Sequence, residues 1–128
     1  MLIKGGESVW VLKLIVVDDN ISDLEGIRQI ADSISFVEWG GSFAKPQEAL
    51  MMMMRNAPDV LITAVELPEM NGLSFTGRLQ ECLPRVHVIV AARSGQYARE
   101  AFEVGARGYL IKPFEKGSLL RLLGNVTK

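Results

Sequence analysis

The sequence predicts an α/β domain in which a parallel sheet is covered by helices on both faces. Five short apolar runs alternate strictly with five segments of helical period over 128 residues, and such alternation is typical of a parallel sheet. The apolar runs are nearly continuous, as expected for strands that are buried on both faces. The chain is long enough to bury one core without disulfides. We therefore expect a single domain.

Each predicted strand is an apolar run, often rich in β-branched residues, that is bounded by turn-forming or charged residues. The first follows a short tail, Met1–Glu7, that we expect to be loose, and it stops abruptly at Asp18. The second is closed by Gly40 and Gly41. The five predicted strands are Val9–Val17, Ser35–Trp39, Asp59–Ala64, Val86–Ala92 and Gly108–Lys112.

The predicted helices are recognised by their apolar period and by their start and stop signals. In the first, Leu24, Ile27 and Ile34 fall on one face, and Ser22 and Glu25 are spaced as a capping box. The five predicted helical segments are Asn20–Ile34, Pro46–Asn56, Leu73–Leu83, Gln96–Ala106 and Glu115–Asn125.

Composition and charge exclude several classes of protein. A hydrophobic content of 48% and a charged content of 23% are ordinary for a soluble globular domain. The net charge of -1 gives no basis for binding nucleic acid or an anionic membrane. The lone Cys82 cannot form an internal disulfide, so we expect a cytoplasmic protein. The apolar run Val9–Val17 is too short to span a bilayer and is interrupted by Lys13.

The ends of the predicted strands carry the residues that could do chemistry, because ligands of open parallel sheets bind outside the carboxyl ends of the strands. These ends supply Asp18, Asp19, Ala64 and Lys112. Adjacent carboxylates suit Mg²⁺, and an ammonium suits a phosphoryl oxygen or a carboxylate. The acidic pair alone could instead cap the first helix, which is favourable by about 0.3–1 kcal/mol per residue. The Lys-Pro after the fifth strand favours a binding site.

Three segments and their order carry a resemblance to a known family: LKLIVVDDN, PDVLITAVELPEMNG and FEVGARGYLIKPF. They resemble the receiver domain of bacterial two-component response regulators, from Leu12 almost to the end of the chain. The resemblance implies a flavodoxin-like three-layer sandwich with a five-stranded parallel sheet in the order 2-1-3-4-5 and five helices. Residues 1–11 are then an N-terminal extension and residues 12–128 the receiver domain. It further implies a non-enzymatic signalling module that a sensor histidine kinase or another signalling protein contacts.

The resemblance also implies a phosphorylation site. In this family an Asp at the third strand tip accepts a phosphoryl group, and Mg²⁺ is held by the acidic pair, by that Asp and by a main-chain carbonyl two residues on. Asp18 and Asp19 match the acidic pair, with Asp19 favoured as the direct ligand. Glu66 matches the residue that offers its carbonyl.

Two further positions match the family's switch. Lys112 matches the lysine that contacts the phosphoryl group. The resemblance also implies a cis bond between Lys112 and Pro113, because the family has one there and X–Pro is where cis bonds occur. Tyr109 matches the aromatic residue that changes rotamer on activation.

Two positions depart from the family's pattern. The phosphoacceptor falls on Ala64, and because an aspartyl phosphate needs a carboxylate nucleophile, phosphorylation at the usual place is not expected. The hydroxyl that would contact the phosphoryl group falls on Val90, Ala91 or Ala92, none of which has one. Ser94, further into the loop, is the nearest hydroxyl.

The departures predict how the remaining charges behave. Without an acid at the third strand tip, Mg²⁺ should bind more weakly, if at all. Lys112 should then turn to Asp18 or Asp19, which partly neutralises the site and lowers its attraction for a cation further.

Ala64 leaves two origins open. It is either an engineered block in an ordinary receiver or the natural residue of a pseudo-receiver that keeps the fold as a binding platform. The missing hydroxyl is a second, independent loss and favours the natural origin.

An alternative class of protein is a Mg²⁺-dependent aspartyl phosphatase that uses Asp18 or Asp19 as its nucleophile. The chain lacks that class's Asp-x-Asp spacing and has no room for a cap over the substrate.

Partner contacts are expected on the face formed by the fourth helix, the fifth strand and the fifth helix, which receivers commonly use for homodimers or partner docking. Tyr97, Arg99, Arg107 and Tyr109 lie on or near it. The domain has no basic patch, so any DNA binding would belong to an attached output domain that regulates transcription.

Two other features have ordinary explanations. Because Met51–Met54 cover about 300° of a helix at 100° per residue, one or two of these side chains should be exposed. His87 lies within an apolar strand and is interpreted as a structural histidine.

Overall fold

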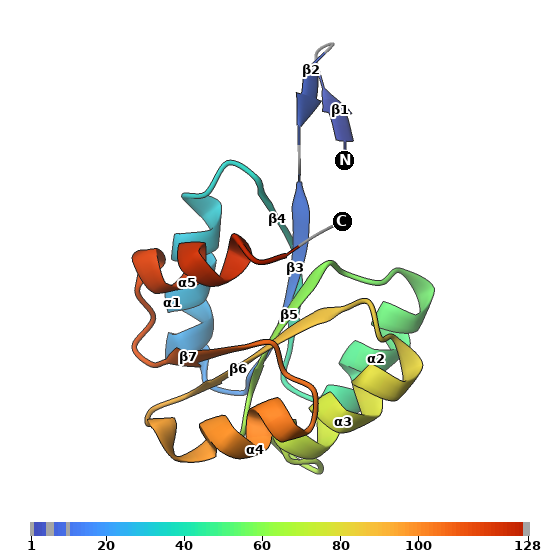
Figure 1. Cartoon of the computed structure of the whole chain (residues 1–128), viewed down its shortest axis with the longest axis vertical. Coiled ribbons are helices and arrows are strands. Elements are labelled where there is room, and N and C mark those ends of the chain that lie inside the picture. The colour runs from blue at the N-terminus through green and yellow to red at the C-terminus, as the bar shows by residue number, and fades with distance from the viewer. Residues whose placement is uncertain (1, 5–6, 10, 127–128) are drawn as a thin grey trace.

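The computed structural model describes residues 2–4, 7–9 and 11–126. Figure 1 shows a central sheet with helices on both sides and a small strand pair beyond one end. The elements are β1 Leu2–Lys4, β2 Glu7–Val9, β3 Leu12–Val17, α1 Ile21–Asp32, β4 Val37–Phe43, α2 Pro46–Arg55, β5 Val60–Ala64, α3 Gly72–Cys82, β6 His87–Ala92, the 3₁₀ helix η1 Gly95–Tyr97, α4 Ala98–Glu103, β7 Gly108–Ile111 and α5 Lys116–Leu123.

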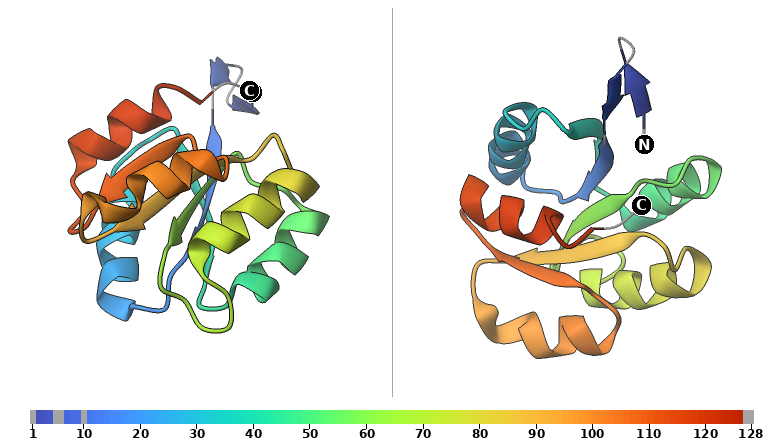
Figure 2. Two further views of the ribbon diagram at one scale, coloured as in Figure 1. Left: turned by 60° about the horizontal axis from the view of Figure 1, so that its bottom comes forward. Right: turned by 45° about the horizontal axis from the view of Figure 1, so that its top comes forward.

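The predicted sheet is confirmed. Its five strands are parallel, and their order is β4-β3-β5-β6-β7, which is 2-1-3-4-5 when the strands of this sheet alone are counted along the chain. The helices α1 and α5 cover one face, and α2, α3 and α4 cover the other (Figure 2). All residues of β5 and β6 are buried, as expected for central strands of a sheet that is covered on both faces. The fold is therefore the flavodoxin-like three-layer sandwich.

The second strand differs from its prediction. Gly40 and Gly41 do not close it but lie within β4, which continues to Phe43. Leu14 of β3 pairs with Trp39 and the next residue, Ile15, pairs with Gly41, so Gly40 is the extra residue of a bulge. Gly41 has a φ of 130°, a conformation that glycine adopts without steric cost. The glycines therefore bend the strand at the sheet edge instead of ending it.

The start of α1 also differs. The predicted capping box of Ser22 and Glu25 does not form, because the N-cap lies two residues earlier than that spacing assumes. Asn20 is the N-cap, and its side chain accepts a hydrogen bond from the Asp23 N–H at 2.9 Å. An Asn at the end of a strand can cap the following helix directly.

The fourth helix is shorter than predicted. The segment Gln96–Ala106 is divided between η1 and α4, and α4 ends at Glu103. Gly105 follows with a φ of 107°, and this left-handed residue terminates the helix in the usual way.

The chain before the sheet is partly ordered. Leu2–Lys4 and Glu7–Val9 form an antiparallel pair, so part of the predicted tail carries local structure. Val9 belongs to β2 and not to the first sheet strand. Residues 1, 5 and 6 of the predicted tail lie outside the described residues.

The methionine run on α2 is more exposed than predicted. Met53 is fully buried, whereas Met51, Met52 and Met54 are 68%, 46% and 57% exposed. Three exposed side chains instead of one or two result because α2 buries only a narrow stripe against the core. Among the described residues, no helix is long and apolar enough to cross a membrane.

Candidate functional site at the strand tips

The carboxyl ends of β3, β5, β6 and β7 meet at one edge of the sheet. Ala64 at the end of β5 pairs with Ala91 of β6, and the N–H of Lys112, just after β7, donates to the Ala92 carbonyl at 2.8 Å. Residues from all four strand ends line a cleft of about 270 Å³, with Asp18 and Lys112 on its wall. The structure thus brings the acidic pair, Ala64 and Lys112 to one place.

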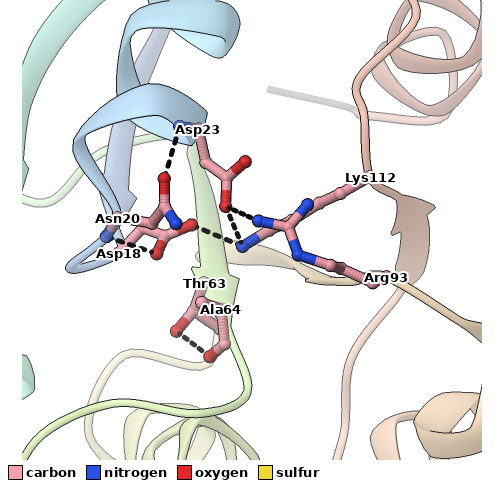
Figure 3. A network of polar contacts seen from close by, with 7 residues as sticks. All are labelled: Asp18, Asn20, Asp23, Thr63, Ala64, Arg93 and Lys112. Atoms are coloured by element: carbon pink, nitrogen blue, oxygen red, sulfur yellow. Dashed lines mark hydrogen bonds and ion pairs between the residues drawn. The ribbon is translucent and has the colours of Figure 1, made fainter.

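Lys112 takes two carboxylates as partners. Its Nζ lies 2.7 Å from Oδ2 of Asp18 and 3.0 Å from Oδ2 of Asp23 (Figure 3). The side chains are buried, with 8% of Lys112, 6% of Asp18 and 11% of Asp23 exposed. The prediction that Lys112 turns to the acidic pair is confirmed for Asp18. The peptide bond between Lys112 and Pro113 is cis, as predicted.

Two charged residues of this cluster were missed by sequence reasoning. Nη2 of Arg93 lies 2.9 Å from the same Oδ2 of Asp23 that accepts from Lys112. Arg93 directly follows a strand tip, which is a signal that could have found it. Asp23 lies in the first turn of α1, where acids are common because they interact favourably with the helix dipole. The sequence therefore does not mark it as a site residue.

Both carboxylate oxygens of Asp18 already accept a hydrogen bond. Its Oδ1 accepts the N–H of Asn20 at 3.1 Å, and its Oδ2 accepts from Lys112. Asp19 is exposed at the cleft mouth. Across residues 2–4, 7–9 and 11–126, no three His, Cys, Asp or Glu side chains are placed to hold one metal ion. Asp18, Asp19 and Glu66 all line the cleft and remain the residues that could hold a metal ion there.

The loop between β5 and α3, residues 65–71, is held mainly by its backbone. The N–H of Gly72 donates to the Val65 carbonyl at 2.7 Å, and a β-carbon at position 72 would overlap the Ala64 carbonyl. Only glycine fits so close to another backbone. The methyl group of Ala64 takes no part in these contacts, so the loop forms without a side chain that could react.

The same loop contains a strained turn. Glu69 has a φ of 70°, and the N–H of Met70 donates to the Pro68 carbonyl at 2.7 Å. A hydrogen bond from the N–H of one residue to the carbonyl two residues before it, with a positive φ at the residue between them, defines the rarer of the two forms of γ-turn. Asn71 then caps α3 by accepting from the Leu73 N–H at 2.7 Å.

The loop between β6 and η1, residues 93–94, is held mainly by side chains. Arg93 reaches Asp23 on α1, and the Ser94 carbonyl accepts from the hydroxyl of Tyr109 at 2.7 Å. Burial raises the pKa of the half-buried Tyr109. The Tyr97 hydroxyl lies 3.5 Å from a carboxylate oxygen of Glu66 across the cleft.

The structure places the predicted partner residues on η1, on α4, on β7 and just before β7. Tyr97 lines the cleft, and Tyr109 contacts the 93–94 loop beside it. Arg99 is exposed on α4 and pairs with Glu103. Arg107 precedes β7 at the amino ends of the strands, where it donates to the Pro84 carbonyl at 3.0 Å.

An open parallel sheet in this order, with acids after its first strand and a lysine before a cis-proline after its last, defines a signalling domain of the response-regulator type. The family model of the response regulator receiver domain matches residues 14–123. The chain belongs to this family. Receiver domains are regulatory, interact with histidine kinases and other signalling proteins, and typically bind Mg²⁺ at an acidic phosphorylation site.

Individual relatives agree with this assignment. The chain is 29% identical over 118 residues to the sensory transduction protein LytT of Bacillus anthracis, covering 92% of this chain and 48% of LytT. It is 26% identical to the chemotaxis protein CheY of Thermotoga maritima, covering 91% of this chain and 98% of CheY. The chain spans about half the length of LytT but nearly all of CheY.

A solved structure shows the same fold. The response regulator domain of Thermotoga maritima CheB superimposes with a TM-score of 0.80 at 22% identity, covering 92% of this chain and 99% of that domain. At this identity the likeness concerns the fold alone.

Proposed function

We propose that this receiver domain signals by protein contact and does not accept a phosphoryl group at the tip of β5. The observation that carries the proposal is Ala64. It is the residue at that strand tip, it is 4% exposed, and it stands opposite Ala91. Its neighbours Thr63 and Val65 are buried and neither is an acid, so no adjacent side chain can replace a carboxylate nucleophile.

The charges around Ala64 support the same proposal. Lys112, the lysine expected to contact a phosphoryl group, is occupied by Asp18 and Asp23 at 2.7 and 3.0 Å. The missing hydroxyl at Ala91 or Ala92 removes a second phosphoryl contact. Each group that would respond to a phosphoryl group is thus absent or already paired.

A weakened Mg²⁺ site is part of the proposal. Asp18 is engaged through both oxygens, and Ala64 supplies no ligand. Asp19 and the Glu66 carbonyl would remain as ligands, and two protein oxygens leave most of an octahedral shell to water. We expect binding at millimolar concentration or weaker.

The partners follow from the family and from the surface. A sensor histidine kinase or another signalling protein is the expected contact, and a homodimer through α4, β7 and α5 is the expected self-contact. Some relatives of about twice this length are named transcriptional regulatory proteins, such as BtsR of Salmonella typhi, which is 30% identical over 113 residues. By analogy, an attached output domain would carry any control of transcription.

The test is incubation with a small acyl phosphate and Mg²⁺, followed by intact mass. We expect no phosphorylated species from the chain itself and a phosphorylated species from Ala64→Asp. Ala57→Asp is the matched control, because Ala57 is exposed and precedes the amino end of β5, the end opposite Ala64. Phosphorylation of the unchanged chain would contradict the proposal. Failure of Ala64→Asp as well would indicate a pseudo-receiver whose remaining site has also degenerated.

A further inference from the structure

One carboxylate oxygen joins the two cations of the cleft. Oδ2 of Asp23 lies 3.0 Å from Nζ of Lys112 and 2.9 Å from Nη2 of Arg93, and Figure 3 shows both side chains reaching it from the same side. Asp18 completes the cluster on the far side of Lys112. Four separate elements therefore meet through side-chain charges: the end of β3, the first turn of α1, the loop after β6 and the end of β7.

The contact with Arg93 differs from the ordinary surface ion pairs of this chain. The pairs Arg28–Asp32 and Arg99–Glu103 each join residues four apart on one helix, with more than half of every side chain exposed. Such pairs contribute little. Asp23 is only 11% exposed, and Arg93 is 70 residues away in sequence. Its ion pair can therefore fix the position of one element relative to another.

A second contact acts at the adjacent residue. The Ser94 carbonyl accepts from the Tyr109 hydroxyl at 2.7 Å, so both residues of the 93–94 loop are tied to the rest of the domain. This loop leads into η1 and α4, and Tyr97 of η1 lines the cleft. The contacts that hold the 93–94 loop therefore also determine where η1 and α4 begin.

We infer that Asp23 is an internal tether: its carboxylate holds the 93–94 loop against α1 and thereby fixes the position of η1 and α4, which follow that loop, without a phosphoryl group. The regulatory meaning of this tether rests on the proposed function, whereas the contact itself does not. Arg93 is the releasable end, because 62% of its side chain is exposed and the pair is open to salt screening. Lys112 and Asp18 remain paired when Arg93 leaves.

Amide hydrogen exchange of residues 93–98 tests the tether, with no phosphodonor present. In Arg93→Gln we expect exchange in this segment to be about fivefold faster. This factor corresponds to the loss of one ion pair at the upper end of the range for exposed pairs. Arg93→Lys should restore most of the protection, because it keeps the charge. Asp23→Asn should speed exchange at least as much as Arg93→Gln, because it removes the charge that Arg93 pairs with and that of a partner of Lys112 as well. Asp32→Asn on the same helix is the control and should change nothing in residues 93–98.

Salt gives an independent readout. Raising the salt concentration should speed exchange of residues 93–98 in the unchanged chain but not in Arg93→Gln, since only the former has the pair to screen. The tether is rejected if Arg93→Gln leaves these amides unchanged, or if Asp32→Asn has the same effect. Either result leaves the phosphorylation experiment unaffected, and phosphorylation of the unchanged chain would leave the tether standing.

Discussion

The two loops beside the cleft are held in place by different kinds of contact. The 65–71 loop is fixed by backbone hydrogen bonds, by the close approach of Gly72 to the Ala64 carbonyl and by the cap at Asn71. The 93–94 loop is fixed by the Arg93 and Tyr109 side chains. A loop held by its backbone keeps its shape when a functional side chain is lost, whereas a loop held by side chains depends on which residues surround it. The first loop therefore keeps its shape around Ala64 without a contribution from that side chain.

Gly72→Ala should have the largest effect, because it breaks the loop that is held by its backbone. A β-carbon there would overlap the Ala64 carbonyl, and backbone atoms cannot move aside cheaply. We expect the free energy of unfolding to fall by about 3 kcal/mol or more, as measured by denaturant titration. Gly26→Ala in α1 is the matched control. No atom lies within 4 Å of a β-carbon at position 26, so it should stabilise the protein by about 0.5–1 kcal/mol. Equal effects at the two glycines would refute the explanation.

Lys112→Met should come next, because it removes the cation that both buried acids share. Asp18 would keep only its contact with the Asn20 N–H, and an uncompensated buried carboxylate is costly. We expect a loss of about 2 kcal/mol in the free energy of unfolding. Lys116→Met, at an exposed lysine, should change it by less than about 0.5 kcal/mol. Adding Asp18→Asn to Lys112→Met should recover part of the loss, and a further loss would contradict the pairing.

Glu69→Gly should stabilise the protein, because the backbone of the 65–71 loop is strained at Glu69. Glu69 has a φ of 70°, which costs a side chain energy and glycine almost none. After the greater freedom of glycine in the unfolded chain is subtracted, we expect a gain of about 0.5–1 kcal/mol. Glu69→Ala is the control, since it removes the carboxylate but keeps the strain. A gain in Glu69→Ala as large as that in Glu69→Gly would assign the effect to charge instead.

The pH dependence of stability should trace to His87 at the far end of β6, and this is the smallest effect. His87 is buried, and its Nε2 has no hydrogen-bond partner within the described residues. Burial, and to a lesser degree the Arg107 charge, lower its pKa below 6.5. The unfolded chain therefore binds the proton more readily, so stability is complete above about pH 6.5 and falls as the pH decreases below it. Denaturant titrations of His87→Leu at several pH values should show a smaller decrease in the free energy of unfolding as the pH falls. An unchanged decrease would assign the acid sensitivity to another group.

Sequence reasoning placed the carboxyl ends of four of the five sheet strands within one residue. It failed where glycine or asparagine acts on backbone geometry. Gly40 and Gly41 were interpreted as the end of a strand, but they form a bulge inside β4. That choice depends on the register against β3, which no local pattern reports. The N-cap was misassigned for a similar reason. Asn20 and the Ser22–Glu25 spacing are both acceptable caps, and the extended backbone of Asn20, with φ -92° and ψ 112°, makes Asn20 the cap.

The sequence by itself determined the alternation of strands and helices, the resemblance to receiver domains and the residues at the strand tips, including the alanine where an acid is expected. These depend on local periodicity and on residue identity, which the chain carries directly. Only the tertiary structure decided which charge pairs with which. Lys112 meets Asp18 across 94 residues and Asp23 across 89, and Arg93 meets Asp23 across 70. Such choices depend on distances of a few ångströms between elements that the fold alone brings together.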